Sequence, residues 1–315
     1  MYKTDLSVCI GSLTLRNPIM PASGTYEFDE SSPYSCPPRE LGAVVVKSVH
    51  RRMRSGNPVP RIVETPGGVI NSVGIPSVGM ERFLREEAPK YARAEAPVVL
   101  SLAASHRHEY GESLSMLEGH TVFSAIELNL SCPNVGTGLP FSADAALLEG
   151  IVREAKEKTK LPIFVKLSPN VTDILSTARA AQDAGADAIV VANTYRAMSI
   201  DIRAQRPALG NISGGMSGPA VKAQTMYLVY RVCSELQVPV IASGGAVCWE
   251  DAVEYILAGA YAVQIGCGNF LNPLLMKGIV QGIDNYLSER GYTSLAQIRG
   301  KALCGSQERC ERSGL

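Results

Sequence analysis

The sequence lacks the features that would place it in a membrane, in an export pathway or on nucleic acid. Its 315 residues contain 30 Lys and Arg against 30 Asp and Glu. The chain therefore has no excess of basic residues of the kind that would indicate a nucleic-acid-binding surface. Apolar runs such as residues 43–46 and 188–192 are far shorter than the ~20 residues that a membrane-spanning helix needs. The N-terminal segment has no sustained apolar stretch, so we expect no signal peptide and a cytoplasmic protein.

Charged residues are also few, at 19% of the chain, whereas apolar residues make up 46%. This composition supplies a large core and argues against disorder. The eight cysteines form no CxxC pair and have no spacing typical of zinc or iron–sulfur ligands. We therefore predict no metal site and interpret the cysteines as thiols in a reducing compartment.

Short, almost continuously apolar segments recur along the chain and predict eight strands, because strands covered on both faces of a parallel sheet have this pattern. The predicted strands are residues 18–21, 43–47, 98–102, 125–129, 163–167, 188–193, 240–243 and 262–266. Helical patterns lie between several of them, at residues 143–158, 174–184, 220–236 and 251–258. Gly185 and Gly259 directly follow two of these helices, as glycine commonly does at a helix end.

This alternation favours an α/β protein with a (β/α)8 TIM barrel that spans residues 1–315 as one domain. A Rossmann-like sheet is the alternative, but Ala-Ser-Gly-Thr follows Pro21 where that fold would have GxGxxG. We expect residues 1–16 to form a hairpin that caps the bottom of the barrel. The Gly- and Pro-rich segment 51–76 should cover part of the active-site face as a loop insertion. The tail, residues 292–315, has no role that the sequence predicts.

Functional groups of a barrel collect at the carboxyl ends of its strands. Lys47 and Lys166 end nearly all-apolar strands, where a buried ammonium group is costly unless it meets an anion. A structural ion pair is the alternative for each lysine. The strand ends offer neither a carboxylate pair for glycoside chemistry nor a histidine cluster for a metal.

Two glycine motifs predict a phosphate site. Ser243-Gly244-Gly245 ends the seventh predicted strand and Gly266-Cys267-Gly268 ends the eighth. Barrels commonly bind phosphate between these two loops, with backbone N–H groups as donors. The alternative is that the glycines only form tight turns.

Cys132 follows the fourth predicted strand, in the polar sequence Asn-Leu-Ser-Cys-Pro-Asn. A lone cysteine is usually a small buried apolar residue, as we expect for Cys233, but a stabilised thiolate in this loop could act as a base or a nucleophile. Four asparagines supply neutral donors and acceptors that suit a planar heterocycle with N–H and C=O groups. They are Asn71, Asn129, Asn134 and Asn193. Any one of them could instead be a turn or cap residue.

The motifs NPIMPASG, VVVKS, INSVG, ELNLSCPN, VKLSPN, ISGGMSGP and IASGG follow one another between about residues 5 and 290. In this combination the sequence resembles the class 1 dihydroorotate dehydrogenases, and VKLSPNVTDI with NISGGMSGP resembles the NAD-linked subclass 1B. The resemblance implies oxidation of (S)-dihydroorotate to orotate with FMN, in pyrimidine biosynthesis. It also implies a homodimer of this chain within a heterotetramer, whose partner subunit carries FAD and a [2Fe–2S] cluster and passes electrons to NAD+.

The resemblance further assigns roles to individual residues. Cys132 matches the catalytic base. The positions that match substrate-binding residues are Lys47, Asn71, Ser72, Val73, Gly74, Ile75, Asn129, Asn134, Asn193 and Thr194. The positions that match FMN-binding residues are Ala22, Ser23, Lys47, Ser48, Ser101, Asn129, Lys166, Ala192, Gly218, Gly244, Gly245, Gly266 and Cys267. Position 267 is usually Thr in the family, so we expect its side-chain bond to the phosphate to be weaker here.

Two other functions stay open on the sequence. A dihydropyrimidine dehydrogenase acting on uracil or thymine would share the cysteine base, but such enzymes tend to differ at the position of Asn134. A flavin- or phosphate-binding module without enzymatic activity, or a purely structural subunit, would leave Cys132, Lys47 and Lys166 unexplained.

Overall fold

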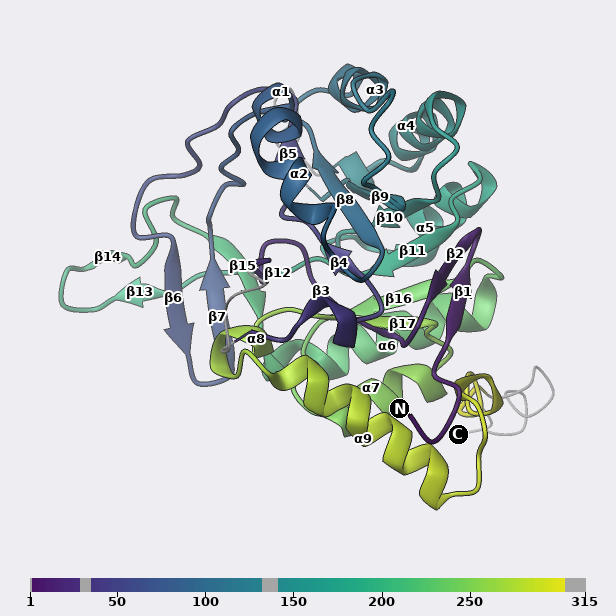
Figure 1. Cartoon of the computed structure of the whole chain (residues 1–315). Helices are drawn as coiled ribbons and strands as arrows, with labels where there is room; N and C mark the ends of the chain where they lie inside the picture. The colour runs from purple at the N-terminus through teal and green to yellow at the C-terminus, as the bar shows by residue number, and fades with distance from the viewer. Residues whose placement is uncertain (1, 29–34, 132–140, 304–315) are drawn as a thin grey trace.

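The computed structural model describes residues 2–28, 35–131 and 141–303 and consists of a parallel barrel surrounded by helices (Figure 1). The strands follow one another around the barrel in the order β3, β17, β16, β11, β10, β9, β8 and β4. Their bounds are Ile19–Pro21, Ala262–Ile265, Val240–Ser243, Ala188–Val191, Ile163–Lys166, Ala125–Asn129, Val98–Ala103 and Val44–Val45. The Gly42 amide donates to the Ile19 carbonyl at 2.7 Å and so joins the β4 side of the ring to β3. The predicted fold class is confirmed, and each predicted strand ends within two residues of the observed end.

The four predicted helices are α4 (Ala145–Lys158), α5 (Ile174–Asp183), α6 (Lys222–Glu235) and α7 (Trp249–Leu257). Gly185 and Gly259 adopt positive φ angles of 90° and 104°, and each follows the single capping residue at the end of α5 or α7, as the stop signals predicted. The sequence analysis missed α1 (Met80–Arg82), α2 (Ala88–Tyr91), α3 (His108–Ser115), α8 (Gly268–Leu271) and α9 (Leu275–Glu289). Within the described ranges, no helix is long and apolar enough to cross a membrane.

The N-terminal hairpin closes one end of the barrel. Strands β1 (Val8–Ile10) and β2 (Leu13–Leu15) pair antiparallel around a turn at residues 11–12. A Cβ at Gly11 would lie 3.1 Å from a carboxylate oxygen of Asp187, which directly precedes β11. The hairpin therefore lies against the amino end of that strand, as predicted for a cap at the bottom of the barrel.

An antiparallel sheet stands at the other end of the barrel, opposite the hairpin in Figure 1. It contains β6 (Ile62–Thr65), β7 (Gly68–Asn71), β15 (Gly214–Ser217) and β12 (Tyr195–Ala197), with β7 and β15 in the middle. A small ribbon of β13 (Ile200–Asp201) and β14 (Arg206–Pro207) extends from the connection between β12 and β15. Segment 51–76, which we expected to cover part of the active-site face as a loop insertion, contains β6 and β7, two strands that the sequence analysis did not predict. Its partner strand β15 lies 144 residues away from β7 in sequence, so the local pattern gives no pairing signal.

The first part of the C-terminal tail packs on the barrel. Leu295 and Ile298 are fully buried, and the Ala302 amide donates to the Leu257 carbonyl at the end of α7. At the other terminus, the Asp284 carboxylate of α9 accepts bonds from the Lys3 and Thr4 amides. Residues 304–315, with Cys304 and Cys310, lie outside the described residues.

The barrel closes at the seam between β3 and β4, and a substitution at Gly42 tests how much this closure contributes to stability. A Cβ at Gly42 would lie 2.1 Å from the Asn17 carbonyl oxygen, which belongs to the backbone and cannot rotate away. We expect Gly42→Ala to lower the free energy of unfolding by about 1–3 kcal/mol, measured by urea denaturation.

Gly278→Ala is the matched control, because a Cβ at that exposed position of α9 would meet nothing within 4 Å. It should raise the free energy of unfolding by about 0.5–1 kcal/mol, the ordinary gain of alanine over glycine in a helix. Equal effects of the two substitutions would contradict the importance of the seam.

Candidate functional site

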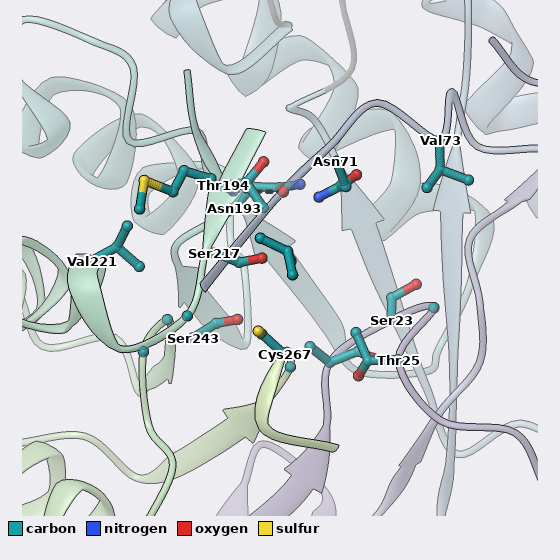
Figure 2. A pocket seen from close by; sticks show the side chains of 18 of the residues that line it. Ser23, Thr25, Asn71, Val73, Asn193, Thr194, Ser217, Val221, Ser243 and Cys267 are labelled. Carbon is teal, nitrogen blue, oxygen red and sulfur yellow. Dashed lines mark hydrogen bonds between the residues drawn. The ribbon is translucent and has the colours of Figure 1, made fainter. Parts of the chain in front are cut away.

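A cavity of about 280 Å³ lies where the carboxyl ends of the barrel strands meet the antiparallel sheet. The strand ends contribute residues such as Ala22, Asn129 and Lys166, and the sheet contributes Asn71 and Met216. Figure 2 shows Asn71, Asn193 and Thr194 gathered toward one end of the cavity, whereas Ser243 and Cys267 lie toward the other. The site therefore has an amide-rich end and an end built from the late βα loops.

Most residues predicted from the sequence line this cavity. They are Ala22, Ser23, Lys47, Ser48, Asn71, Val73, Gly74, Ile75, Asn129, Lys166, Ala192, Asn193, Thr194, Gly218, Gly244, Gly245, Gly266 and Cys267. Two predicted residues do not line it: Ser72 binds the side chains of Asn57 and Asn211, and Ser101 lies buried beneath it. Cys132 and Asn134 lie outside the described residues.

Lys47 and Lys166 occupy different environments. The Lys47 side chain is exposed and donates a hydrogen bond to the Pro76 carbonyl, so the expectation that its ammonium group is buried is wrong. Its pKa is lowered, first by partial desolvation and then by the positive charge of Arg61. Lys47 is thus a cation at the cavity wall that is favourably placed for an anionic group.

Lys166 is only 5% exposed. Its Nζ donates to Oε1 of Gln264 at 2.8 Å, and the Gln264 amide donates to Oε2 of Glu127 at 2.6 Å. Burial lowers the pKa of Lys166, and the negative charge of Glu127 opposes that shift. The lysine thus reaches a carboxylate through an amide, which differs from the direct structural ion pair that was the alternative on the sequence.

The asparagines form a connected cluster at the amide-rich end. Asn129 Nδ2 donates to Ser48 Oγ at 3.2 Å, and Asn193 Nδ2 donates to Asn129 Oδ1 at 3.2 Å. Ser131, which the sequence analysis did not single out, donates to Asn129 Oδ1 at 2.6 Å and accepts from Asn193. On the sheet side, Asn71 Nδ2 donates to the Gly215 carbonyl at 3.3 Å. Fixed amides of this kind suit a ligand edge that carries both N–H and C=O groups.

Glycines at the opposite end leave room for a ligand to approach the backbone. Gly244 and Gly245 have φ angles of 149° and 77°, and a Cβ at Gly245 would lie 2.6 Å from the backbone of Lys222. Glycine is required there both by conformation and by space. Burial raises the pKa of the neighbouring Cys267 thiol, which favours its neutral form beside an anion.

Sequence reasoning missed several cavity residues. Ser217, Tyr195, Met216 and Val69 belong to the antiparallel sheet, and their place in the cavity depends on that long-range pairing. Glu127 and Gln264, which are buried and do not line the cavity, were also missed although each is a polar residue inside a predicted apolar strand. A polar residue within an otherwise apolar strand was the sequence signal that could have identified them.

The dihydroorotate dehydrogenase family matches residues 5–287. The chain belongs to this family. It is 43% identical to the catalytic subunit of dihydroorotate dehydrogenase B (NAD+) from Desulforudis audaxviator, over 95% of this chain and 98% of the relative. The subunits of the same name from Pelobacter propionicus and Desulforamulus reducens are 41% and 42% identical, over 96% and 95% of this chain and 100% and 99% of the relatives. These relatives confirm the NAD-linked subclass that the motifs indicated.

Proposed function

We propose that this chain oxidises (S)-dihydroorotate to orotate in pyrimidine biosynthesis, with FMN as the immediate electron acceptor and NAD+ as the final one. The observation that carries the proposal is that one cavity, in a member of this family, combines a cation and an amide cluster with a glycine-lined end. The cation and the amide cluster suit a charged pyrimidine, and the glycine-lined end suits a phosphate.

The residues present fit FMN. Gly218, Gly244, Gly245 and Gly266 line one end of the cavity, where backbone N–H groups can approach a phosphate, and Ser217 and Ser243 add hydroxyl groups. Lys166 supplies a buried positive charge at the floor of the same cavity. When bound, FMN supplies the hydride acceptor that none of the twenty amino-acid side chains can provide.

The other end of the cavity fits the substrate. We assign Lys47 to the carboxylate of dihydroorotate and Asn71, Asn129 and Asn193 to the edge of its ring. Cys132 is the proposed base that removes the proton from C5, on the family resemblance, and Asn134 is proposed as a further ring contact. The hydrogen bonds among Asn129, Ser131 and Asn193 hold the amide groups in place before the ligand arrives, which lowers the ordering cost of binding.

The proposal includes a second subunit. The relatives are named catalytic subunits, and we infer an assembly in which a homodimer of this chain binds an FAD- and [2Fe–2S]-containing partner. The free thiols of Cys9, Cys36, Cys233, Cys248 and Cys267 agree with the cytoplasmic location that we propose.

Orotate titration tests the substrate assignment. Adding orotate to the purified flavoprotein should shift the visible absorption of the flavin, because the ligand enters the same cavity. Uracil and thymine are the comparison ligands. A response to uracil but not to orotate would favour a dihydropyrimidine dehydrogenase, and a colourless protein would contradict the proposal.

The glycine-lined end of the cavity predicts which cofactor the chain holds and which substitution weakens cofactor binding. Denatured wild-type protein should release one FMN per chain, and release of FAD would contradict the phosphate site. Gly245→Ala adds a Cβ 2.6 Å from Lys222 at a φ angle of 77°. It should weaken FMN binding at least tenfold, measured by flavin fluorescence. Gly291→Ala is the control, because Gly291 also has a positive φ, a Cβ there would meet no atom within 4 Å, and the residue does not line the cavity; this variant should bind FMN as the wild type does.

The need for a partner predicts how the isolated chain behaves. Purified alone, the chain should reduce an artificial dye at the expense of dihydroorotate but should reduce NAD+ at under about 1% of that rate, which corresponds to a barrier at least ~2.7 kcal/mol higher. Adding the partner subunit should restore NAD+ reduction. Rapid NAD+ reduction by the single chain would contradict the two-subunit assignment.

The proposed base predicts a rate effect without a binding effect. Cys132→Ser should retain FMN and orotate binding, whereas reduction of its flavin by dihydroorotate should slow by at least about 10²-fold, because a hydroxyl is a far weaker base than a thiolate. The loss should be clearest below pH 8, and Cys132→Ala should be as slow or slower.

Cys233→Ser is the control in the same stopped-flow experiment. Burial raises the pKa of Cys233 to about 12, which removes it from chemistry at neutral pH, so its substitution should change stability and not the rate. Wild-type flavin reduction by Cys132→Ala would remove Cys132 from the mechanism.

A further inference from the structure

The Lys166 ammonium group ends a chain of buried polar side chains that crosses the barrel interior. It runs from Lys166 to Gln264, from Gln264 to Glu127 and from Glu127 to Ser101, with bonds of 2.8, 2.6 and 3.1 Å. Glu127 and Ser101 are fully buried, and Gln264 is 1% exposed. Ser101 then shares a 2.8 Å bond with Ser48, which lines the cavity.

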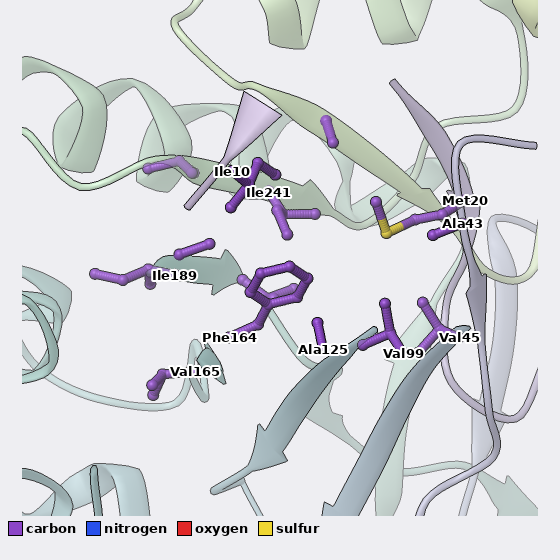
Figure 3. Packing of buried hydrophobic residues seen from close by; sticks show 14 of the residues in the cluster. Ile10, Met20, Ala43, Val45, Val99, Ala125, Phe164, Val165, Ile189 and Ile241 are labelled. Carbon is purple, nitrogen blue, oxygen red and sulfur yellow. The ribbon is translucent and has the colours of Figure 1, made fainter. Parts of the chain in front are cut away.

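Strand register explains why these side chains meet. Ser101 pairs with Glu127 between β8 and β9, and Gln264 pairs with Ser243 between β17 and β16, so each pair points to the same side of the sheet. Lys166 lies two residues after Phe164 and points the same way. Figure 3 shows Phe164 directed into the barrel and the adjacent Val165 directed away. The polar chain therefore lies inside the barrel, on the cavity side of its apolar layer.

The hydrogen bonds set the orientation of the Gln264 amide. Its Oε1 faces the Lys166 ammonium group, which can only donate, and its Nε2 faces the Glu127 carboxylate, which accepts. Reversing the amide would place two donors against each other at Lys166 and two acceptors against each other at Glu127. The Glu127 side chain, which accepts from the Gln264 amide nitrogen, thus keeps the amide oxygen toward Lys166.

Charge balance gives Glu127 a second effect on the same lysine. An ammonium group buried without a counter-charge costs several kcal/mol or gives up its proton. Neutral Gln264 transmits orientation but no net charge, so the carboxylate of Glu127 provides the compensation within the barrel. Because the Gln264 amide lies between Glu127 and Lys166, the carboxylate does not contact the lysine directly, and the lysine can face a ligand in the cavity.

We propose that Glu127 is a positioning residue for the cofactor: through Gln264 it fixes the Lys166 side chain at the cavity floor and keeps its positive charge available to the reduced, anionic flavin. The inference rests on the proposed FMN site. Glu127 acts on the flavin through Lys166 and does not itself line the cavity.

The test is the reduction potential of FMN in the purified wild-type chain and in Glu127→Gln, measured by spectroscopic titration against a reference dye. Removing a nearby negative charge would by itself make the flavin easier to reduce. Loss of the fixed Lys166 ammonium group would instead make the flavin harder to reduce. We expect Glu127→Gln to lower the reduced-to-oxidised ratio at a given potential at least tenfold, or about 30 mV for a two-electron couple.

A double-mutant cycle with Lys166→Met tests whether the effect passes through the lysine. In the Lys166→Met background, Glu127→Gln should no longer lower the potential. Gln264→Met breaks the same link while retaining the carboxylate, so it should also lower the potential, and it decides the question if Glu127→Gln does not retain FMN. Asp284→Asn is the control, because it neutralises a buried carboxylate that caps Lys3 and Thr4 and should leave the potential unchanged.

An unchanged or raised potential in Glu127→Gln would overturn the proposal, and so would an equal decrease in the Lys166→Met background. Either result, in chains that contain FMN, leaves the proposed function intact. A wild-type chain that binds no FMN would overturn the proposed function and this inference together.

Discussion

Burial of the Lys166 ammonium group inside the barrel is the constraint on which the site depends. A charge in an apolar interior is tolerated only where other groups orient and compensate it. Glu127 and Gln264 meet that requirement from strands β9 and β17, which lie on different sides of β10 around the ring. The position of the lysine is thus determined by three strands, and the register of each strand matters to it.

This constraint divides the barrel interior into two parts. Toward the N-terminal hairpin, residues such as Val45, Val99 and Phe164 fill the interior with apolar atoms. Toward the cavity, hydroxyls, amides and the Glu127 carboxylate form a connected polar layer. Burial of the apolar part stabilises the fold. The polar part contributes less to stability, but it presents fixed hydrogen-bond donors and the Lys166 ammonium group to a ligand.

The sequence predicted what depends on local pattern. The eight strands, four of the helices, the N-terminal hairpin and the cluster at the strand ends all follow from short apolar runs and from glycine positions. The antiparallel sheet could not be predicted, because β7 and β15 are only four residues each and are paired with each other across a long separation in sequence. The same limit hid Glu127: its strand was recognised, but whether a charged residue inside it meets a partner depends on the register of a strand more than a hundred residues away.

The pairing of β7 with β15 also has a consequence for how the chain assembles. Asn71 and Gly215 lie beside each other, yet nearly half of the polypeptide separates them. During synthesis from the N-terminus, β7 leaves the ribosome long before its partner exists, so the wall formed by this sheet closes late, after much of the barrel sequence has emerged. A nascent chain that stops before Gly214 carries most of the strands but lacks one wall of the cavity, which makes the ligand site a marker of near-complete folding.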